Sequence, residues 1–223
     1  MTPGRRVLVS ACSVALTVCA LGVPLMLMLA PPYTAALVLY VDAPEIAGLD
    51  PVQTQELAEQ VRAFVAGEKG SRLPASTSDG RPAFDEKALA HLADVRDLLH
   101  SVRLVTYVAI VATAAWFLIT IRARWKHELS ISLLAAALGI LATMGLAAAL
   151  ACADFEWFFT AFHGVFFTHG TWQFPGDALL IGLFPERFWI VSAAVWGVLS
   201  SLIAVVLGVW GWWGARRASR GRE

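Results

Sequence analysis

The sequence predicts an all-α polytopic membrane protein, in which four transmembrane helices carry a small extracytoplasmic domain. Three observations lead to this prediction. Of the 223 residues, 58% are hydrophobic, whereas apolar residues make up about half of a soluble domain. Four stretches carry no charged residue and are long enough to cross a bilayer, which takes roughly 20 apolar residues in a helix. The charged residues are unevenly divided among the segments that connect these stretches.

The four uncharged stretches are the expected transmembrane helices, at residues 7–30, 104–121, 129–153 and 188–213. The second has only 18 residues, so we expect the preceding helix to extend it. The alternation of apolar and polar residues that a membrane-spanning barrel needs is absent, which leaves the α-helix as the structure that satisfies the backbone in lipid. Pro24 predicts a kink in the first helix.

The basic residues predict which ends of these helices face the cytoplasm. The N-terminal residues, the short connection 122–128 and the tail 214–223 together hold nine Lys and Arg and two acidic residues. The two long connections, 31–103 and 154–187, hold eight basic and fifteen acidic residues. The positive-inside rule therefore places both termini and the short connection in the cytoplasm, and both long segments on the outer side.

The first outer segment contains signals for local structure. We expect residues 34–41 to be extended. Asp50, followed by proline, is a suitable N-cap for a helix over residues 51–66, where apolar residues recur at helical spacing. Residues 67–82 are rich in Gly, Ser, Pro and charge, which predicts a mobile loop. Asp85 is the expected cap of a helix that runs without a break into the second transmembrane stretch.

On that last helix a histidine shares a face with apolar residues. The stripe consists of His91, Val95, Leu98, Val102 and Val105. His91 should therefore face the protein interior near the membrane boundary, with Asp94 at the edge of the stripe. One interpretation is a buried histidine paired with a carboxylate for structural reasons. The other is a functional group, because ionisable residues near bilayer depth are costly and usually functional.

The second outer segment is unusually aromatic, with nine Phe and Trp residues between positions 155 and 174. Such a segment is typical of the headgroup region of a membrane. On a helix, Glu156, Thr160 and His163 would form one polar stripe. This stripe could belong to an interfacial anchor that faces water, or His163 could be functional. The residues from His169 to Thr171 read as a turn.

Motifs of soluble chemistry are absent. The sequence has no glycine-rich phosphate loop, no H-E-x-x-H motif, no paired-cysteine zinc motif and no G-x-S-x-G elbow. Nucleic-acid binding is not indicated either, because basic residues gather only where membrane topology requires them. Two histidines remain, His91 and His163, and a pair of imidazoles can divide general-base and general-acid roles near neutral pH.

Two motifs occur in the order found in a known family. Residues 84–96 read FDEKALAHLADVR, which resembles the pattern E…H-[LM]-x-D-V-[KR]. Residues 162–186 contain FHGVFF, then Trp172, Asp177 and LFPE, which resemble F-H-x-x-F-F … W … D-x-L-I-x-L-F-P-E. Both patterns are those of the bacterial lipoprotein intramolecular transacylases, a group of small four-span membrane proteins.

This resemblance implies an acyl migration without a metal or cofactor. Enzymes of that family move the sn-2 acyl chain of a diacylglyceryl-cysteine to the α-amino group of the same N-terminal cysteine, which leaves a lyso-form lipoprotein. By position, the catalytic histidines of the family correspond to His91 and His163. We favour His163 as the base because it lies among lipid-facing aromatic residues. The implied partners are a diacylated lipoprotein and membrane lipids, and the oligomeric state is not indicated.

Further residues around the histidines are candidates for support or substrate positioning: Asp94, Arg96, Glu156, Thr160, His169, Trp172 and Asp177. Two alternatives stay open. In the first, a membrane hydrolase uses a zinc ion bound by His91, Asp94, His163 and His169. In the second, a non-catalytic membrane scaffold or transport accessory protein contains histidines that only pack.

Overall fold

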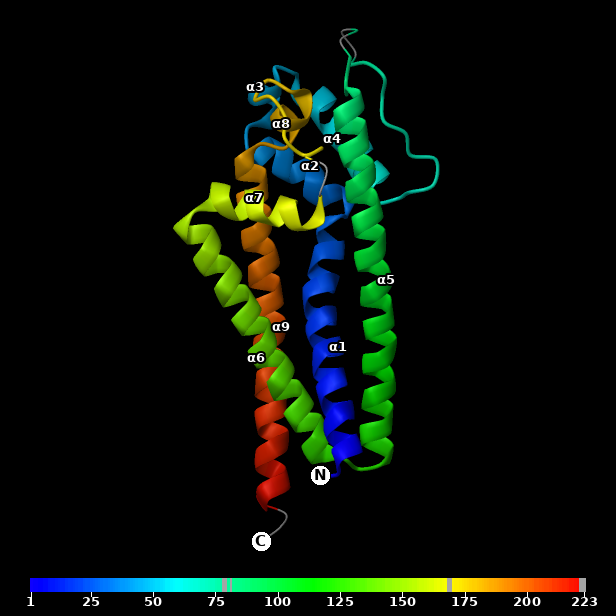
Figure 1. The fold of residues 1–223 in the computed structure, drawn as a ribbon, viewed down its shortest axis with the longest axis vertical. Helices are drawn as coiled ribbons and strands as arrows, with labels where there is room; N and C mark the ends of the chain where they lie inside the picture. The colour runs from blue at the N-terminus through cyan, green and yellow to red at the C-terminus, as the bar shows by residue number, and fades with distance from the viewer. Residues whose placement is uncertain (78–79, 81, 168–169, 221–223) are drawn as a thin grey trace. The chain divides into compact units, whose positions relative to one another are not determined.

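The computed structural model describes residues 1–77, 80, 82–167 and 170–220, without the side chains of 218–220, and this part of the chain is built of α-helices (Figure 1). The helices are α1 (Pro3–Met28), α2 (Pro31–Tyr40), α3 (Ala43–Ala47), α4 (Pro51–Val65), α5 (Glu86–Arg122), α6 (Lys126–Ala153), α7 (Phe155–Phe166), α8 (Leu179–Leu183) and α9 (Glu186–Arg220). Strand-like pairing in the described residues is limited to one isolated bridge between Ser76 and Pro82. The predicted all-α fold class is confirmed.

Four helices, α1, α5, α6 and α9, are long and apolar enough to cross a membrane. Each extends beyond an uncharged stretch of the sequence at one or both ends. The predicted unbroken helix before the second stretch is confirmed, because α5 is continuous from Glu86 to Arg122. The carboxylate of Asp85 accepts a hydrogen bond of 2.7 Å from the amide of Ala88, as expected of a cap.

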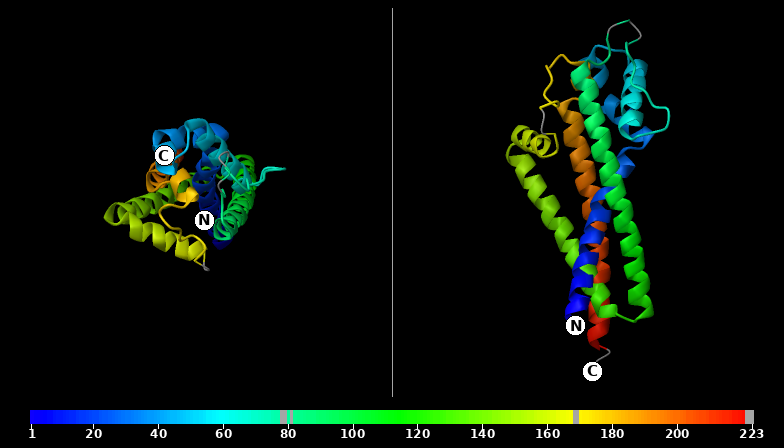
Figure 2. Two further views of the ribbon diagram at one scale, coloured as in Figure 1. Left: turned by 90° about the horizontal axis from the view of Figure 1, so that it is seen from above. Right: turned by 45° about the vertical axis from the view of Figure 1, so that its right-hand side comes forward.

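The chain divides into two compact units. The first unit consists of Met1–Leu25, Arg103–Ala153 and Trp196–Glu223, and the second of Met26–Val102 and Asp154–Val195. In the first unit α6 is inclined to the other long helices (Figure 2).

Small residues allow the helices of the first unit to approach closely. A Cβ atom added at Gly22 would lie 2.1 Å from Oγ1 of Thr106, and one added at Gly211 would lie 3.0 Å from the carbonyl oxygen of Ser130. Such small-residue contacts are a main source of helix packing in lipid, where the hydrophobic effect does not drive helices together.

The second unit has its own apolar core, formed where α2, α3, α4 and α8 lie together (Figure 1). Its buried members are Leu37, Val38, Val41, Ala43, Leu57, Ala58, Val61, Val65, Ala88, Leu92, Leu180, Leu183, Phe184 and Phe188. The predicted helix after Asp50 is confirmed as α4, and its apolar stripe packs into this core. Asp50 caps α4 by accepting hydrogen bonds from the amides of Val52 and Gln53. The core therefore holds the first turns of α5 against α4 and α8.

The prediction that residues 34–41 are extended is wrong, because residues 34–40 belong to α2 and Val41 is its C-cap. Prolines at the first two positions start this helix with a favourable φ and lose no helical hydrogen bond there. Thr34, Leu37 and Val38 are its buried residues, a helical spacing that presents one face to the core. The packing of this face in the core stabilises the helix over a segment that also contains β-branched residues.

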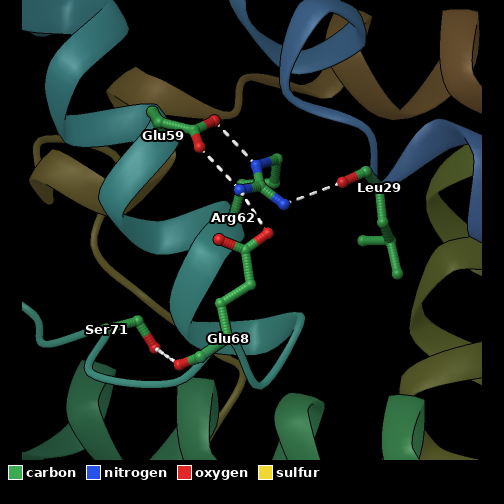
Figure 3. Close-up of polar contacts among 5 residues, drawn as sticks. All are labelled: Leu29, Glu59, Arg62, Glu68 and Ser71. Carbon is green, nitrogen blue, oxygen red and sulfur yellow. Dashed lines mark hydrogen bonds and ion pairs between the residues drawn. The ribbon is translucent and has the colours of Figure 1, made fainter.

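An arginine is buried in the second unit, within the apolar stripe of α4 (Figure 3). The side chain of Arg62 is 3% exposed and forms ion pairs with Glu59 at 2.6 Å and with Glu68 at 2.7 Å. Its Nη1 donates a hydrogen bond of 2.8 Å to the carbonyl oxygen of Leu29. A buried charge is tolerated when it is paired and hydrogen-bonded in this way.

Candidate active site

Two helices of the second unit bring His91 and His163 together. His91 lies in the second turn of α5, more than three turns before the uncharged stretch that starts at Leu104. His163 lies near the C-terminal end of α7. The centres of the two imidazole rings are 6.2 Å apart, and the ring planes form an angle of 34°. His91 is 8% exposed, so the predicted inward orientation of this residue is confirmed.

Aromatic rings enclose the two imidazoles. The ring centres of Phe167 and Phe174 lie 5.0 Å and 5.6 Å from that of His91. Four ring centres lie near that of His163: Phe159 at 4.0 Å, Trp172 at 4.9 Å, Phe162 at 5.4 Å and Phe167 at 5.6 Å. Phe167 contacts both histidines. The rings bury His91 and partly bury His163, and burial of this kind favours the uncharged form of a histidine.

A backbone hydrogen bond fixes the tautomer of His163. Its Nδ1 atom lies 2.8 Å from the carbonyl oxygen of Phe159, one helical turn earlier. A carbonyl oxygen can only accept a hydrogen bond, so the hydrogen of the neutral ring is on Nδ1. The lone pair is therefore on Nε2, which is the nitrogen that can act as a base.

Burial keeps both imidazoles uncharged at neutral pH. Burial lowers the pKa of His91 to about 4; a positive charge on His163 also lowers it, whereas the carboxylate of Asp94 raises it. The pKa of His163 is lowered by burial, and the hydrogen bond to Phe159 opposes this effect. The pair therefore consists of one potential base and one neutral hydrogen-bond donor.

The lowered pKa of His91 predicts a pH dependence of stability. In the unfolded chain this histidine takes up a proton near pH 6.5, but in the folded protein only near pH 4. The stability that depends on neutral His91 is therefore present above about pH 6.5 and is lost as the pH falls towards about 4. In detergent, the unfolding midpoint of the wild type should fall more steeply over this window than that of His91→Asn. Parallel curves for the two proteins would contradict the prediction.

Side chains of α5 hold the segment 170–174, which we call the strap. The hydroxyl of Thr171 donates a hydrogen bond of 3.1 Å to Oδ2 of Asp94. The ammonium group of Lys87 donates to the carbonyl oxygen of Gln173. The structure thus brings two candidates from the sequence, Asp94 and Trp172, to the histidines.

The other candidates lie elsewhere in the described residues. Arg96 lies over the ring of Phe64 at 5.0 Å and contacts Asp97 at 3.4 Å. Glu156, Thr160 and Asp177 are exposed, and no hydrogen bond or ion pair described for the chain joins them to the histidines. The expected polar stripe of α7 does not act as one group, since His163 is turned towards aromatic residues. His169 lies outside the described residues.

Several residues that contact the site were not among the candidates from the sequence. Phe159 and Phe167 precede and follow His163 by four residues, so helical spacing alone could have indicated them. Lys87 precedes His91 by the same spacing. Thr171 and Phe174 have no such signal, because they reach α5 through a long-range contact.

A metal site is not evident in the described part of the chain, where no three His, Cys, Asp or Glu side chains gather closely enough to hold an ion. The proposed zinc ligands included His169, which is outside the described residues. The zinc hypothesis is therefore a prediction that the structure does not test.

Four apolar helices and a pair of uncharged imidazoles held side by side characterise an integral membrane protein with an acid–base site. The model of the family "lipoprotein intramolecular transacylase Lit" matches residues 8–189. The chain belongs to this family. It is therefore an acyl-transferring membrane enzyme that acts on lipoproteins, and the resemblance seen in the two sequence motifs is confirmed.

Solved structures support the family assignment at the level of the fold. The chain is similar to the membrane-integral lipoprotein intramolecular transacylase Lit from Bacillus cereus, with a TM-score of 0.81 and 14% identity over 97% of this chain and 98% of that one. Two structures of that protein with one histidine replaced by arginine or alanine match with a TM-score of 0.76 and 13% identity, over 97% of this chain and 94% or 96% of theirs. No curated protein sequence matches this chain.

Proposed function

We propose that His91 and His163 together catalyse the transfer of the sn-2 acyl chain of a diacylglyceryl-cysteine to the α-amino group of the same cysteine. The observation that supports this proposal best is the arrangement of the two rings. They lie 6.2 Å apart, and the hydrogen bond to Phe159 leaves Nε2 of His163 free to accept a proton.

His163 acts as the base. The substrate ammonium, whose pKa is about 7.7–8.0, first loses one proton to water. The neutral amine then attacks the carbonyl carbon of the sn-2 ester, and Nε2 of His163 takes a second proton as the C–N bond forms. Burial lowers the pKa of His163, so the imidazolium is a good acid and passes this proton on readily.

His91 stabilises the oxyanion of the tetrahedral intermediate. With a pKa of about 4, it stays neutral and offers an N–H group as a donor. A donor of this kind contributes about 10²–10³ in rate. When the C–O bond to glycerol breaks, the proton held by His163 goes to the glycerol oxygen. One ester and one amine thus become one amide and one alcohol, with no cofactor or water consumed.

The reaction takes place near the outer membrane surface in this proposal, with both termini in the cytoplasm. The division of basic and acidic residues supports this orientation. So do the exposed apolar side chains of α7, among them Trp157 at 56% and Val165 at 72%, which suit the headgroup region of a bilayer. A reporter fused to the C-terminus that works only in the cytoplasm tests the orientation, and an inactive but expressed fusion would contradict it.

Mass spectrometry of a lipoprotein tests the proposed reaction. The N-terminal peptide of one lipoprotein is analysed from cells that lack N-acyltransferases, with and without this protein. We expect an N-acylated, lyso-glyceryl peptide only when the protein is present. A peptide that stays diacylated although the protein is expressed and folded would contradict the proposal.

A further inference from the structure

We propose that Thr171 and Asp94 are positioning residues that keep water away from the two histidines and so direct the acyl chain to the amine rather than to hydrolysis. Their hydrogen bond holds the strap, residues 170–174, against α5. This inference rests on the proposed function and adds to it a pair that decides between two products.

The strap is fastened at two points of α5 that flank a histidine. Lys87, His91 and Asp94 have the spacing i, i+4 and i+7, which places them on one face of a helix. Lys87 binds the strap at the carbonyl of Gln173, and Asp94 binds it at the hydroxyl of Thr171. His91, which lies between them on the helix, is the candidate oxyanion donor.

Two aromatic residues of the strap, Trp172 and Phe174, lie next to the imidazoles. Trp172 lies 4.9 Å from the ring of His163, and Phe174 lies 5.6 Å from the ring of His91. Gly170 begins the strap with a φ of 65°, a left-handed conformation that suits glycine. The position of both rings therefore depends on the contacts that hold this short segment.

An unpartnered nitrogen shows how closely the rings cover the site. Nδ1 of His91 is buried and has no hydrogen-bond partner among the described residues. A water molecule that reached it would remove the cost of this unpaired group. Hydration of this nitrogen therefore favours movement of the strap away from α5. The hydrogen bonds that Asp94 and Lys87 form with the strap oppose this movement.

Exclusion of water matters because water competes with the amine. If water attacks the sn-2 ester carbonyl, the ester is cleaved to a free fatty acid and a glycerol hydroxyl, and the cysteine amine remains unacylated. Both reactions use the same base and the same oxyanion donor. The strap therefore changes the ratio of transfer to hydrolysis.

The test uses Thr171→Val, which keeps the shape but removes the hydroxyl, and Thr171→Ser, which keeps the hydroxyl. Each full-length protein is reconstituted in phospholipid vesicles with a diacylated lipoprotein, and the N-acylated and unacylated lyso products are quantified by mass spectrometry. For Thr171→Val we expect transfer to fall about 10-fold, as for loss of a hydrogen bond to a charged acceptor. The hydrolysed fraction should rise, while Thr171→Ser should keep the wild-type ratio.

A chemical probe and a second variant separate positioning from damage to the fold. Diethyl pyrocarbonate should modify His91 faster in Thr171→Val than in Thr171→Ser. Asp94→Leu should behave like Thr171→Val, and the double variant should be no worse than either, because both remove the same contact.

The inference about the strap and the proposed function are contradicted by different results. Equal product ratios and equal modification rates in the valine and serine variants would overturn the inference. If His163→Asn still transfers acyl chains, the proposed function fails instead, whatever the strap variants do.

Discussion

Replacement of His163 by asparagine is expected to reduce acyl transfer by at least about 10²–10⁴-fold, the usual contribution of a general base. The side-chain amide of asparagine can still donate to the carbonyl of Phe159, the partner of Nδ1 in the wild type, but it has no basic nitrogen. Replacement of His91 by glutamine should retain more activity. The pKa of about 4 makes His91 a neutral donor, and a glutamine amide also donates a hydrogen bond.

The measurement is the single-turnover rate of transfer in vesicles for His163→Asn, His91→Gln and the matched control His100→Asn. His100 is exposed on α5, so its replacement should have little effect. If His91→Gln were less active than His163→Asn, the roles assigned to the two histidines would be reversed. If both equalled the control, neither histidine would take part in the chemistry.

Replacement of Arg62 by methionine is expected to destabilise the second unit by about 3 kcal/mol, the lower end of the range for breaking a buried ion pair. Methionine fills much of the space of the arginine but leaves two carboxylates without a counter-charge and the carbonyl of Leu29 without this donor. Glu59 and Glu68 are 38% and 51% exposed in their side chains. Water therefore screens part of the loss.

Equilibrium unfolding in detergent measures this loss, with Glu68→Gln as the matched control. That variant keeps Arg62 paired with Glu59 and should cost less than about 1 kcal/mol, because Glu68 is half exposed and water screens its charge. The triple variant Glu59→Gln, Arg62→Met, Glu68→Gln should recover part of the stability, because it removes the unpaired charges as well. Wild-type stability of Arg62→Met would show that the arginine does not stabilise the unit.

Local signals in the sequence predicted much of the fold. Helix α4 follows from its cap at Asp50 and its apolar spacing, and the unbroken α5 from its cap at Asp85 and the uncharged stretch that it enters. The inward orientation of His91 followed from the apolar stripe on α5. Residues 34–41 were wrongly predicted to be extended, because the prolines that start α2 and the packing of its buried face in the core give this segment a helical conformation.

Long-range contacts account for what the sequence did not predict. The distance between His91 and His163 depends on how α5 and α7 pack, and the strap contact joins residues 77 positions apart. Arg62 was overlooked because apolar spacing identifies a buried face without indicating a charge in its middle. The partners of that charge lie on α4, on the loop after it and at Leu29.

The hydrogen bond between His163 and Phe159 has a consequence for regulation of the base. The carbonyl that fixes the tautomer belongs to Phe159, about two turns before the C-terminal end of α7, whereas His163 itself lies in the last turn. Helix ends commonly fray, and fraying of this last turn would separate Nδ1 from the carbonyl and let the hydrogen move to Nε2. The imidazole would then present a donor to the substrate amine and could not accept its proton, so the order of one helical turn would control whether the enzyme is active.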